Sequence, residues 1–427
     1  MKANTTSTPG GRVASGMAAH LYAQMITVLT QLATVPIFLH RWSADTYGQW
    51  IAISAVPVYL TIADVGILTA AGNLMSMHNA RGEHEQLQAV FKAGLGVVLI
   101  VVPAASALSG LLLYFFTFGM SVDQRSALFA LTLASLLTVA SGLFDAAYRS
   151  FGKYPKVTFL LSTARVVEWS GMLAGLFAGG TLTSTAIGYL AGRGMSFTAN
   201  YCFSRHDIPQ IKWNLRGVDR RLAARLSKSG AGFISITLGS LLTLQGMVVL
   251  VGAELGGTAV AVFSTTRTLT RLLAQLAVLS GKSMSPEISA LYGAGRHAVA
   301  DRLTKQMTRL VMSVILAGAV VLALIAPTVM VIWSHGKIPF DRPVFFLLLA
   351  AALATSYWQV QAVRLTATNQ HQLFAGLFIL TSVFALVLTY LGMPRFGVNS
   401  AAAGTLLADL LMIGATFAAL RLRRLAA

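Results

Sequence analysis

The chain has 427 residues, of which 56% are hydrophobic and only 11% are charged, and it contains a single cysteine. A soluble domain has about 25% charged residues, so this composition excludes most soluble enzymes and disordered chains. One cysteine excludes disulfide scaffolds and zinc modules built on cysteine clusters. The formal net charge is +18. Together these values indicate a helical membrane protein with many spans.

Long uncharged stretches mark the membrane-spanning segments. Val13–His40, Ala93–Val122 and Leu310–Gly336 contain 28, 30 and 27 residues without Lys, Arg, Asp or Glu. A spanning helix needs about 20 apolar residues, so each stretch is long enough to cross a bilayer. The whole pattern predicts an all-α polytopic membrane protein with about twelve transmembrane helices. We expect them near residues 14–39, 49–78, 93–117, 127–149, 158–180, 185–204, 229–252, 258–281, 306–332, 343–366, 373–394 and 400–420.

Lysine and arginine are distributed unevenly between the two sides of this arrangement. One set of connections holds 22 of the 32 basic residues, and the opposite set holds five. The positive-inside rule therefore predicts that both termini are cytoplasmic, and it explains most of the net charge. The basic residues lack interleaved aromatic residues, which argues against a nucleic-acid partner. We expect the first span to be retained, because its apolar run is too long for a signal peptide.

The longest hydrophilic connection, residues 205–228, falls near the middle of the chain. It predicts an N-terminal six-helix lobe over residues 1–204, a basic amphipathic linker at the cytoplasmic membrane surface over 205–228, and a C-terminal six-helix lobe over 229–427. A helix of this kind is anchored by anionic membrane lipids. In transporters built from two repeats the binding site lies where the halves meet, so we expect a central cavity there.

Several short motifs resemble those of a known family. They are the run Pro36–Arg41, Tyr47 and Gly48 followed by Trp50, Asp64 with Gly66, Ala80–Gly82, and the segment Pro286–Gly293. In this order the motifs resemble the polysaccharide-transport proteins. These are lipid-linked oligosaccharide flippases of the O-antigen type, within the multidrug/oligosaccharidyl-lipid/polysaccharide exporter superfamily.

The resemblance implies a function as well as a fold. It implies two six-helix lobes around a central cavity that opens alternately to each side of the bacterial inner membrane. The implied substrate is an undecaprenyl-pyrophosphate-linked oligosaccharide, moved from the cytoplasmic to the periplasmic leaflet for lipopolysaccharide or exopolysaccharide synthesis. Partners would be a polysaccharide polymerase and glycosyltransferases. No catalytic residue, metal or cofactor is expected, and coupling to H⁺ or Na⁺ is left open.

Five arginines lie inside predicted spans, where charge is costly and marks a candidate functional site. Arg267 and Arg271 are four residues apart and so share a helix face near the membrane midplane. Pyrophosphate accepts bidentate contacts from arginine, so we predict an anion site here, with Arg193 as a third donor from the other lobe. The alternative is that this span begins later and both arginines serve its cytoplasmic edge. Arg364 is expected to extend its charged end to the cytoplasmic surface.

Acidic residues inside the spans have several interpretations. Glu168 is three residues from Arg165, so the two either pair structurally or contribute to binding. Asp64, in the middle of its span, is predicted to pair with Arg267 across the lobes, to act as a protonatable coupling site, or to accompany a kink at Gly66. Asp409 is a similar candidate for coupling or pairing. A local pair is expected between Asp145 and Arg149, which are four residues apart.

Two other function classes compete with the flippase. A multidrug or organic-cation antiporter would carry an excess of intramembrane carboxylates, whereas the predicted spans hold five arginines against four acids, Asp64, Asp145, Glu168 and Asp409. This balance favours an anionic substrate. A membrane-bound polysaccharide polymerase or glycosyltransferase would need paired carboxylates or a large periplasmic loop. No predicted periplasmic connection exceeds about a dozen residues and the sequence shows no metal-ligand cluster, so we expect no enzyme activity.

Overall fold

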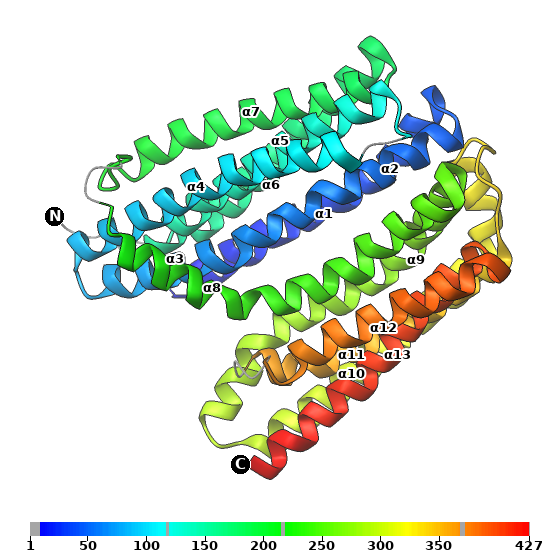
Figure 1. Cartoon of the computed structure of the whole chain (residues 1–427). Helices are drawn as coiled ribbons and strands as arrows, with labels where there is room; N and C mark the ends of the chain where they lie inside the picture. Colours follow the sequence, from blue (N-terminus) through cyan, green and yellow to red (C-terminus); the bar gives the residue numbers. More distant parts are fainter. Residues whose placement is uncertain (1–8, 117–118, 215–217, 368–371, 427) are drawn as a thin grey trace. The chain divides into compact units, whose positions relative to one another are not determined.

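The structure is a computed structural model that describes residues 9–116, 119–214, 218–367 and 372–426, and within these ranges it contains helices and turns but no strand (Figure 1). The first half comprises α1 (Pro9–Arg41), α2 (Ala44–Val58), the 3-10 turn η1 (Tyr59–Thr61), α3 (Ile62–Ala80), α4 (His84–Phe116), α5 (Val122–Ser150), α6 (Tyr154–Gly179) and α7 (Leu182–Asp207). The second half comprises α8 (Arg220–Leu241), the π-helical turn η2 (Leu242–Gly246), α9 (Met247–Gly293), α10 (His297–Trp333), α11 (Arg342–Thr366), α12 (Gln372–Phe396) and α13 (Val398–Ala426).

Each predicted span coincides with helical structure, which confirms the all-α polytopic fold. In the part of the chain that the structure describes, seven helical segments are long and apolar enough by themselves to cross a membrane. The helices are interrupted or change direction at two places along the predicted spans. The span over 49–78 is divided by η1, just after Pro57, which cannot donate a backbone hydrogen bond. The spans over 229–252 and 258–281 share the long α9, whose direction changes at Gly256, where φ is 80°.

Residue contacts divide the chain into two compact units. Unit 1 contains Met1–Thr34 and Pro57–Ile234, and unit 2 contains Val35–Val56 and Ser235–Ala427. The end of α1 and most of α2 therefore group with the C-terminal helices, although the sequence places residues 1–204 in one lobe. The central cavity between lobes stays a prediction.

In unit 1, glycines bring α6 and α7 into backbone contact. A Cβ atom placed on Gly188 of α7 would lie 2.2 Å from the carbonyl oxygen of Gly171, and one on Gly175 would lie 2.1 Å from that of Ser184. Small residues spaced four apart allow such an approach between membrane helices. A Cβ on Gly192 would likewise lie 2.8 Å from the carbonyl oxygen of Val167, whereas one on Gly194 would meet nothing within 4 Å.

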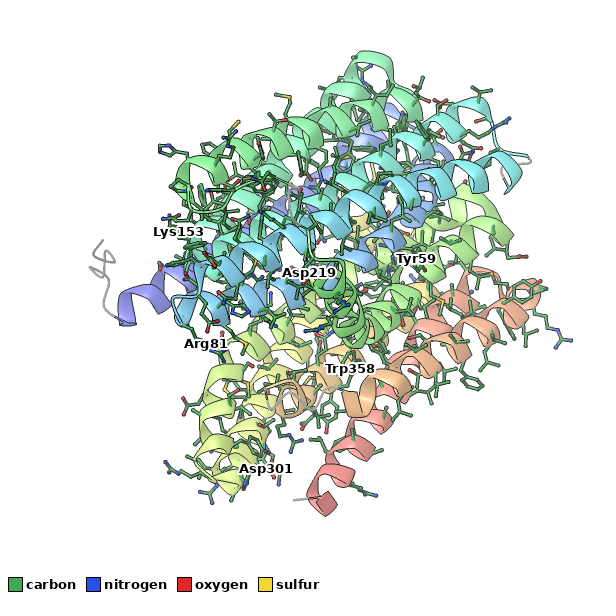
Figure 2. All side chains as sticks on the ribbon, turned by 60° about the vertical axis from the view of Figure 1, so that its left-hand side comes forward. Tyr59, Arg81, Lys153, Asp219, Asp301 and Trp358 are labelled. Atoms are coloured by element: carbon green, nitrogen blue, oxygen red, sulfur yellow. The ribbon has the colours of Figure 1, made fainter. Side chains whose placement is uncertain are left out.

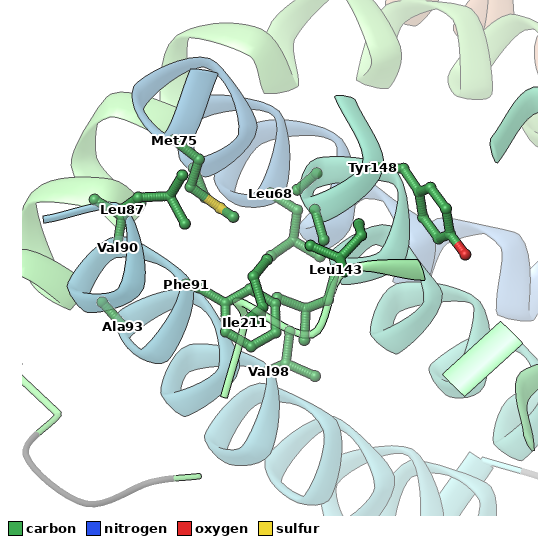
Figure 3. Packing of buried hydrophobic residues seen from close by; sticks show 14 of the residues in the cluster. Leu68, Met75, Leu87, Val90, Phe91, Ala93, Val98, Leu143, Tyr148 and Ile211 are labelled. Carbon is green, nitrogen blue, oxygen red and sulfur yellow. The ribbon is translucent and has the colours of Figure 1, made fainter. Parts of the chain in front are cut away.

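The beginning of the predicted linker packs into the apolar core of unit 1. Ile208 and Ile211 are only 1% and 4% exposed, and Ile211 lies beside Phe91 in this core (Figure 3). The side-chain amide of Gln88 makes two hydrogen bonds with the backbone of Lys212, donating to its oxygen and accepting from its nitrogen, each at 2.8 Å. This part of the linker is therefore held by α4 and belongs structurally to unit 1.

In unit 2, the segment Val35–Val56 packs on α9 through the motif that resembles the transport family. A Cβ on Gly48 would lie 1.7 Å from the carbonyl oxygen of Gly257, so the two backbones touch. Aromatic side chains surround this contact, with Phe38 against Trp42 at 4.9 Å between ring centroids and against Trp50 at 6.0 Å. The Tyr-Gly-x-Trp motif is thus a packing element of unit 2.

Candidate binding cavities

A cavity of about 100 Å³ lies inside unit 2. A single buried water needs only about 10–15 Å³ on this measure, so the space holds several waters or one compact polar group. Trp358 of α11, labelled in Figure 2, lies on its wall. The polar lining comes from the α8–η2 region, α9, α11 and α13, and consists of Ser240, Thr243, Arg267, Thr270, Arg271, Thr355, Trp358, Gln359, Thr405 and Asp409.

Arg267 is held in this cavity by the π-helical turn. Within η2 the regular α-helical hydrogen bonding is replaced, and such turns occur often at functional sites. The guanidinium of Arg267 donates through Nη1 to the carbonyl oxygen of Leu244 at 2.7 Å, and its Cζ lies 5.0 Å from the centroid of the Phe263 ring. The bond to Leu244 uses one of the five N–H donors that a guanidinium carries.

Arg271 lies one turn further along α9 and lines the same cavity, as the spacing of four predicts. It is attracted electrostatically by Asp409 of α13. The carboxylate of Asp409 accepts a hydrogen bond from Trp358 Nε1 at 2.9 Å and another from the side chain of Thr355. Two guanidinium groups and one carboxylate give the cavity lining a net charge of plus one, which suits an anion.

Unit 1 contains two further cavities, of about 600 and 220 Å³. The larger is lined by helices α3, α5, α6 and α7, and the smaller by α1, α6 and α7. Arg165, Glu168 and Tyr189 line both, so the two spaces adjoin at these three side chains.

The charges in these cavities pair differently from the sequence prediction. Glu168, 4% exposed, forms an ion pair with Arg193, which also donates to the hydroxyl of Thr138. Arg165, the expected partner of Glu168, instead donates through Nη1 to Thr27 Oγ1 at 3.0 Å. The pairing follows from the close packing of α6 against α7, which places Arg193 opposite Glu168.

Other predicted residues have mixed outcomes. The predicted pair of Asp145 and Arg149 is confirmed, with Arg149 Nε 2.7 Å from Asp145 Oδ2.

The prediction that Arg364 extends its charged end to the cytoplasmic surface was wrong. Arg364 is buried and pairs at 3.0 Å with Asp301 of α10, which is labelled in Figure 2. A carboxylate from a neighbouring helix satisfies its charge inside the protein. Asp64 lies on α3, but its side chain is outside the described residues.

The structure therefore groups the predicted residues into two sets. Arg267, Arg271 and Asp409 line the cavity of unit 2, and Arg165, Glu168 and Arg193 line those of unit 1. The proposed cooperation of Arg193 with the unit 2 arginines stays a prediction. Sequence reasoning missed Thr355, Trp358 and the Leu244 carbonyl. Their positions depend on helix packing, which the sequence does not show directly. The indole N–H of Trp358 in an apolar span is the one feature of the sequence that could have indicated a buried polar partner.

No protein-family model and no curated protein matches the sequence. Solved structures do match the fold. The inward-facing conformation of a multidrug resistance MATE family transporter of the MOP superfamily has a TM-score of 0.74 and 14% identity, over 93% of this chain and 98% of that one. The lipid II flippase MurJ, in an inward closed conformation, has a TM-score of 0.68 and 12% identity, over 94% of this chain and 87% of that one.

A third similar structure is a MOP superfamily transporter from Pyrococcus furiosus, described as having a binding pocket of reverse polarity that suggests a different function. Its TM-score is 0.63 at 11% identity, over 98% of this chain and 96% of that one. Identities this low establish the fold alone. The chain therefore has the multi-pass helical fold of these transporter and flippase structures.

Proposed function

We propose that the protein is a flippase for an undecaprenyl-pyrophosphate-linked oligosaccharide, which it moves from the cytoplasmic to the periplasmic leaflet by alternating access. The observation that carries this proposal is the cavity of unit 2, where Arg267 and Arg271 lie together inside a membrane helix. A fold shared with the MurJ flippase supports a lipid-linked substrate.

The chemistry of the cavity fits a pyrophosphate group. Guanidinium groups bind phosphate oxygens through paired N–H donors, and hydrogen bonds to charged groups are stronger than neutral ones. The side chains of Thr243, Thr270 and Thr355 line the same space and add polar groups beside the two guanidinium groups. Pyrophosphate is the part of such substrates that stays constant while the sugars vary, so a dedicated cationic site serves every substrate of this class.

The proposal also includes a cellular setting. Both termini lie in the cytoplasm of a bacterium, and the protein works beside glycosyltransferases that build the lipid-linked oligosaccharide and a polymerase that consumes it. In this proposal Arg267 and Arg271, with Arg193 as a third donor, bind the pyrophosphate, and Arg165 binds the glycan. Asp64, Glu168 and Asp409 serve coupling to H⁺ or Na⁺ or pairing between lobes.

A multidrug antiporter is the second candidate, because the MATE structure has the higher TM-score of the two named families. The charge of the unit 2 cavity argues against an antiporter, because its two guanidinium groups outnumber the single carboxylate of Asp409. An organic cation would be repelled by this excess. The Pyrococcus furiosus transporter provides a precedent for linking pocket polarity to function within this fold.

A strain that lacks the protein separates the two candidates. We expect it to accumulate lipid-linked oligosaccharide in the cytoplasmic leaflet and to recover surface polysaccharide when the wild-type protein is supplied. An Arg271→Ala variant that inserts normally should restore much less. Normal polysaccharide in the deletion strain, together with increased sensitivity to cationic drugs, would instead identify an antiporter.

A further inference from the structure

We propose that unit 1 contains a saccharide-binding site of its own, which prefers a sugar bearing a carboxylate and uses Arg165 as the cation that recognises it. The inference rests on the proposed function and deepens it, because it names a class of sugar in the transported oligosaccharide. The site is separate from the unit 2 cavity, which is assigned to pyrophosphate.

The space in unit 1 has the size of a ligand site. Ligand pockets commonly measure about 300–1,000 Å³, and the larger cavity of unit 1, at about 600 Å³, lies within that range. The adjoining cavity adds about 220 Å³ on the other side of Arg165, Glu168 and Tyr189. These three side chains can therefore be contacted by a ligand from both spaces.

The charges that line these spaces leave one cation in excess. Two arginines are neutralised by direct ion pairs, Arg193 by Glu168 and Arg149 by Asp145. Arg165 has a neutral hydrogen-bond partner, the Thr27 hydroxyl, and is influenced more weakly by Glu168. Its side chain is exposed and lines both cavities. A carboxylate brought by a ligand would balance this charge.

The geometry around Arg165 suits a carboxylate. A guanidinium binds a carboxylate through two parallel N–H···O bonds, and its planar fork needs little ordering once one edge is fixed. Thr27 Oγ1 fixes Nη1 of Arg165, and this contact uses only one of the five donors. The remaining donors are available to a ligand in the adjoining spaces.

Aromatic and hydroxyl groups supply the surface that a sugar ring needs. Tyr189 and Trp169 line the smaller cavity, and Trp169 Nε1 donates to Thr34 Oγ1 at 2.9 Å, which fixes the orientation of the indole. Aromatic rings offer an apolar face to C–H groups together with a polar edge. Ser135 and Ser141 of α5 line the larger cavity and offer hydroxyls to the hydroxyls of the sugar.

The test compares two probes that differ in their carboxyl groups, which are charged in one and esterified in the other. Digalacturonic acid and its dimethyl ester are titrated into the purified full-length protein in detergent, and binding is followed by saturation-transfer NMR and by tryptophan fluorescence. We expect the acid to bind roughly ten- to a hundredfold more tightly than the ester, as the loss of a charged hydrogen bond would give. Equal affinities for acid and ester would overturn the inference.

Variants assign the preference to Arg165. Arg165→Gln should bind acid and ester equally, Arg165→Lys should retain part of the preference, and Thr27→Val, which removes the positioning hydroxyl, should reduce it. Arg125→Gln, an exposed arginine at the start of α5, is the matched control and should behave as wild type. An Arg165→Gln protein that melts normally and still prefers the acid would contradict the proposal. If that variant does not fold, Thr27→Val and the comparison of acid with ester decide the matter.

The same samples keep this inference distinct from the proposed function. Binding of inorganic pyrophosphate should be unchanged in Arg165→Gln and weakened in Arg271→Ala. If the wild type binds pyrophosphate but does not prefer the acid to the ester, only the saccharide site is refuted. If the wild type prefers the acid but does not bind pyrophosphate, the proposed function is refuted and the saccharide site is supported.

Discussion

Arg267 on α9 donates to the backbone carbonyl of Leu244 in the π-helical turn at 2.7 Å, so a side chain of one helix completes the hydrogen bonding of an irregular turn in another part of the chain. A buried carbonyl that loses its hydrogen-bond partner is costly, so this bond stabilises the turn. This contact gives Arg267 a structural role in addition to the proposed binding role, whereas Arg271 has no such described bond to the backbone.

Arg267→Ala is therefore expected to destabilise unit 2 by about 1–3 kcal/mol, the cost of a buried polar group that loses its partner. Arg271→Ala should destabilise it less, because it leaves no described backbone group unpaired. Thermal unfolding in detergent measures both. Equal melting temperatures for wild type and Arg267→Ala would show that the bond to Leu244 contributes nothing to stability.

Close packing of α6 against α7 gives a second prediction. Gly188→Val should destabilise unit 1 by about 1–3 kcal/mol or more, because its Cβ would collide with the Gly171 carbonyl oxygen at 2.2 Å. It should also separate Glu168 from Arg193. Gly194→Ala is the matched control on the same helix, since its Cβ would meet nothing within 4 Å. Similar melting temperatures for the two variants would contradict this packing.

The spacing of residues predicted part of the site, for physical reasons that can be named. Arg267 and Arg271 were expected on one helix face because helical periodicity is local, and they do line one cavity. The position of Asp409 beside them depends on how α13 packs against α9 and α11, which no local pattern encodes. Glu168 likewise pairs with Arg193 because glycines on both helices permit close approach.

The fold was more predictable than the site, because a bilayer requires long apolar helices whatever their packing. The positions where helices break or change direction were less predictable than the spans. Gly256 lies inside the continuous α9, and Pro57 precedes a 3-10 turn, but hydropathy alone does not report a local change of direction. Grouping Val35–Val56 with unit 2 follows from the contact of Gly48 with Gly257, between segments far apart in the sequence.

The end of α7 provides a test by pH. Asp207 accepts hydrogen bonds from Tyr148 at 2.6 Å and from Lys156 at 2.7 Å. Burial acts to raise the pKa of Asp207, but these bonds and the charges of Lys156 and Lys153 outweigh it and hold the pKa below its ordinary value of 3.8. A lowered folded-state pKa stabilises the protein above the unfolded pKa, and this contribution is lost as the pH falls through the folded value.

We therefore expect the wild type to melt at a higher temperature than Asp207→Asn at pH 6, and the difference to shrink as the pH is lowered below 4. Thermal unfolding across this range, with both proteins in the same detergent, provides the measurement. A difference that stays constant with pH would remove the carboxylate charge of Asp207 from the explanation.

Orientation in the membrane is tested by labelling single cysteines. In a Cys202→Ser background, cysteines placed at Ser121, Thr183 and Lys337 should react with an impermeant thiol reagent added from the periplasm. Cysteines at Lys153, Arg220 and Arg296 should react only after the membrane is opened. This pattern follows from the asymmetry of the basic residues. The reverse pattern would place both termini outside the cytoplasm.

The most direct measurement of the central claim is the affinity of purified wild type and Arg271→Ala for an undecaprenyl-pyrophosphate-linked oligosaccharide. Hydrogen bonds to charged groups contribute about 1.5–3 kcal/mol, so Arg271→Ala should bind roughly ten- to a hundredfold more weakly. Arg271→Lys should recover only part of the loss, because an ammonium does not reproduce the guanidinium fork. A lipid-linked sugar without pyrophosphate should bind the wild type at least as weakly as the variant binds the complete substrate, because it loses the contacts of both Arg267 and Arg271. Equal affinity of wild type and Arg271→Ala, or equal affinity of the wild type for both lipids, would contradict the account.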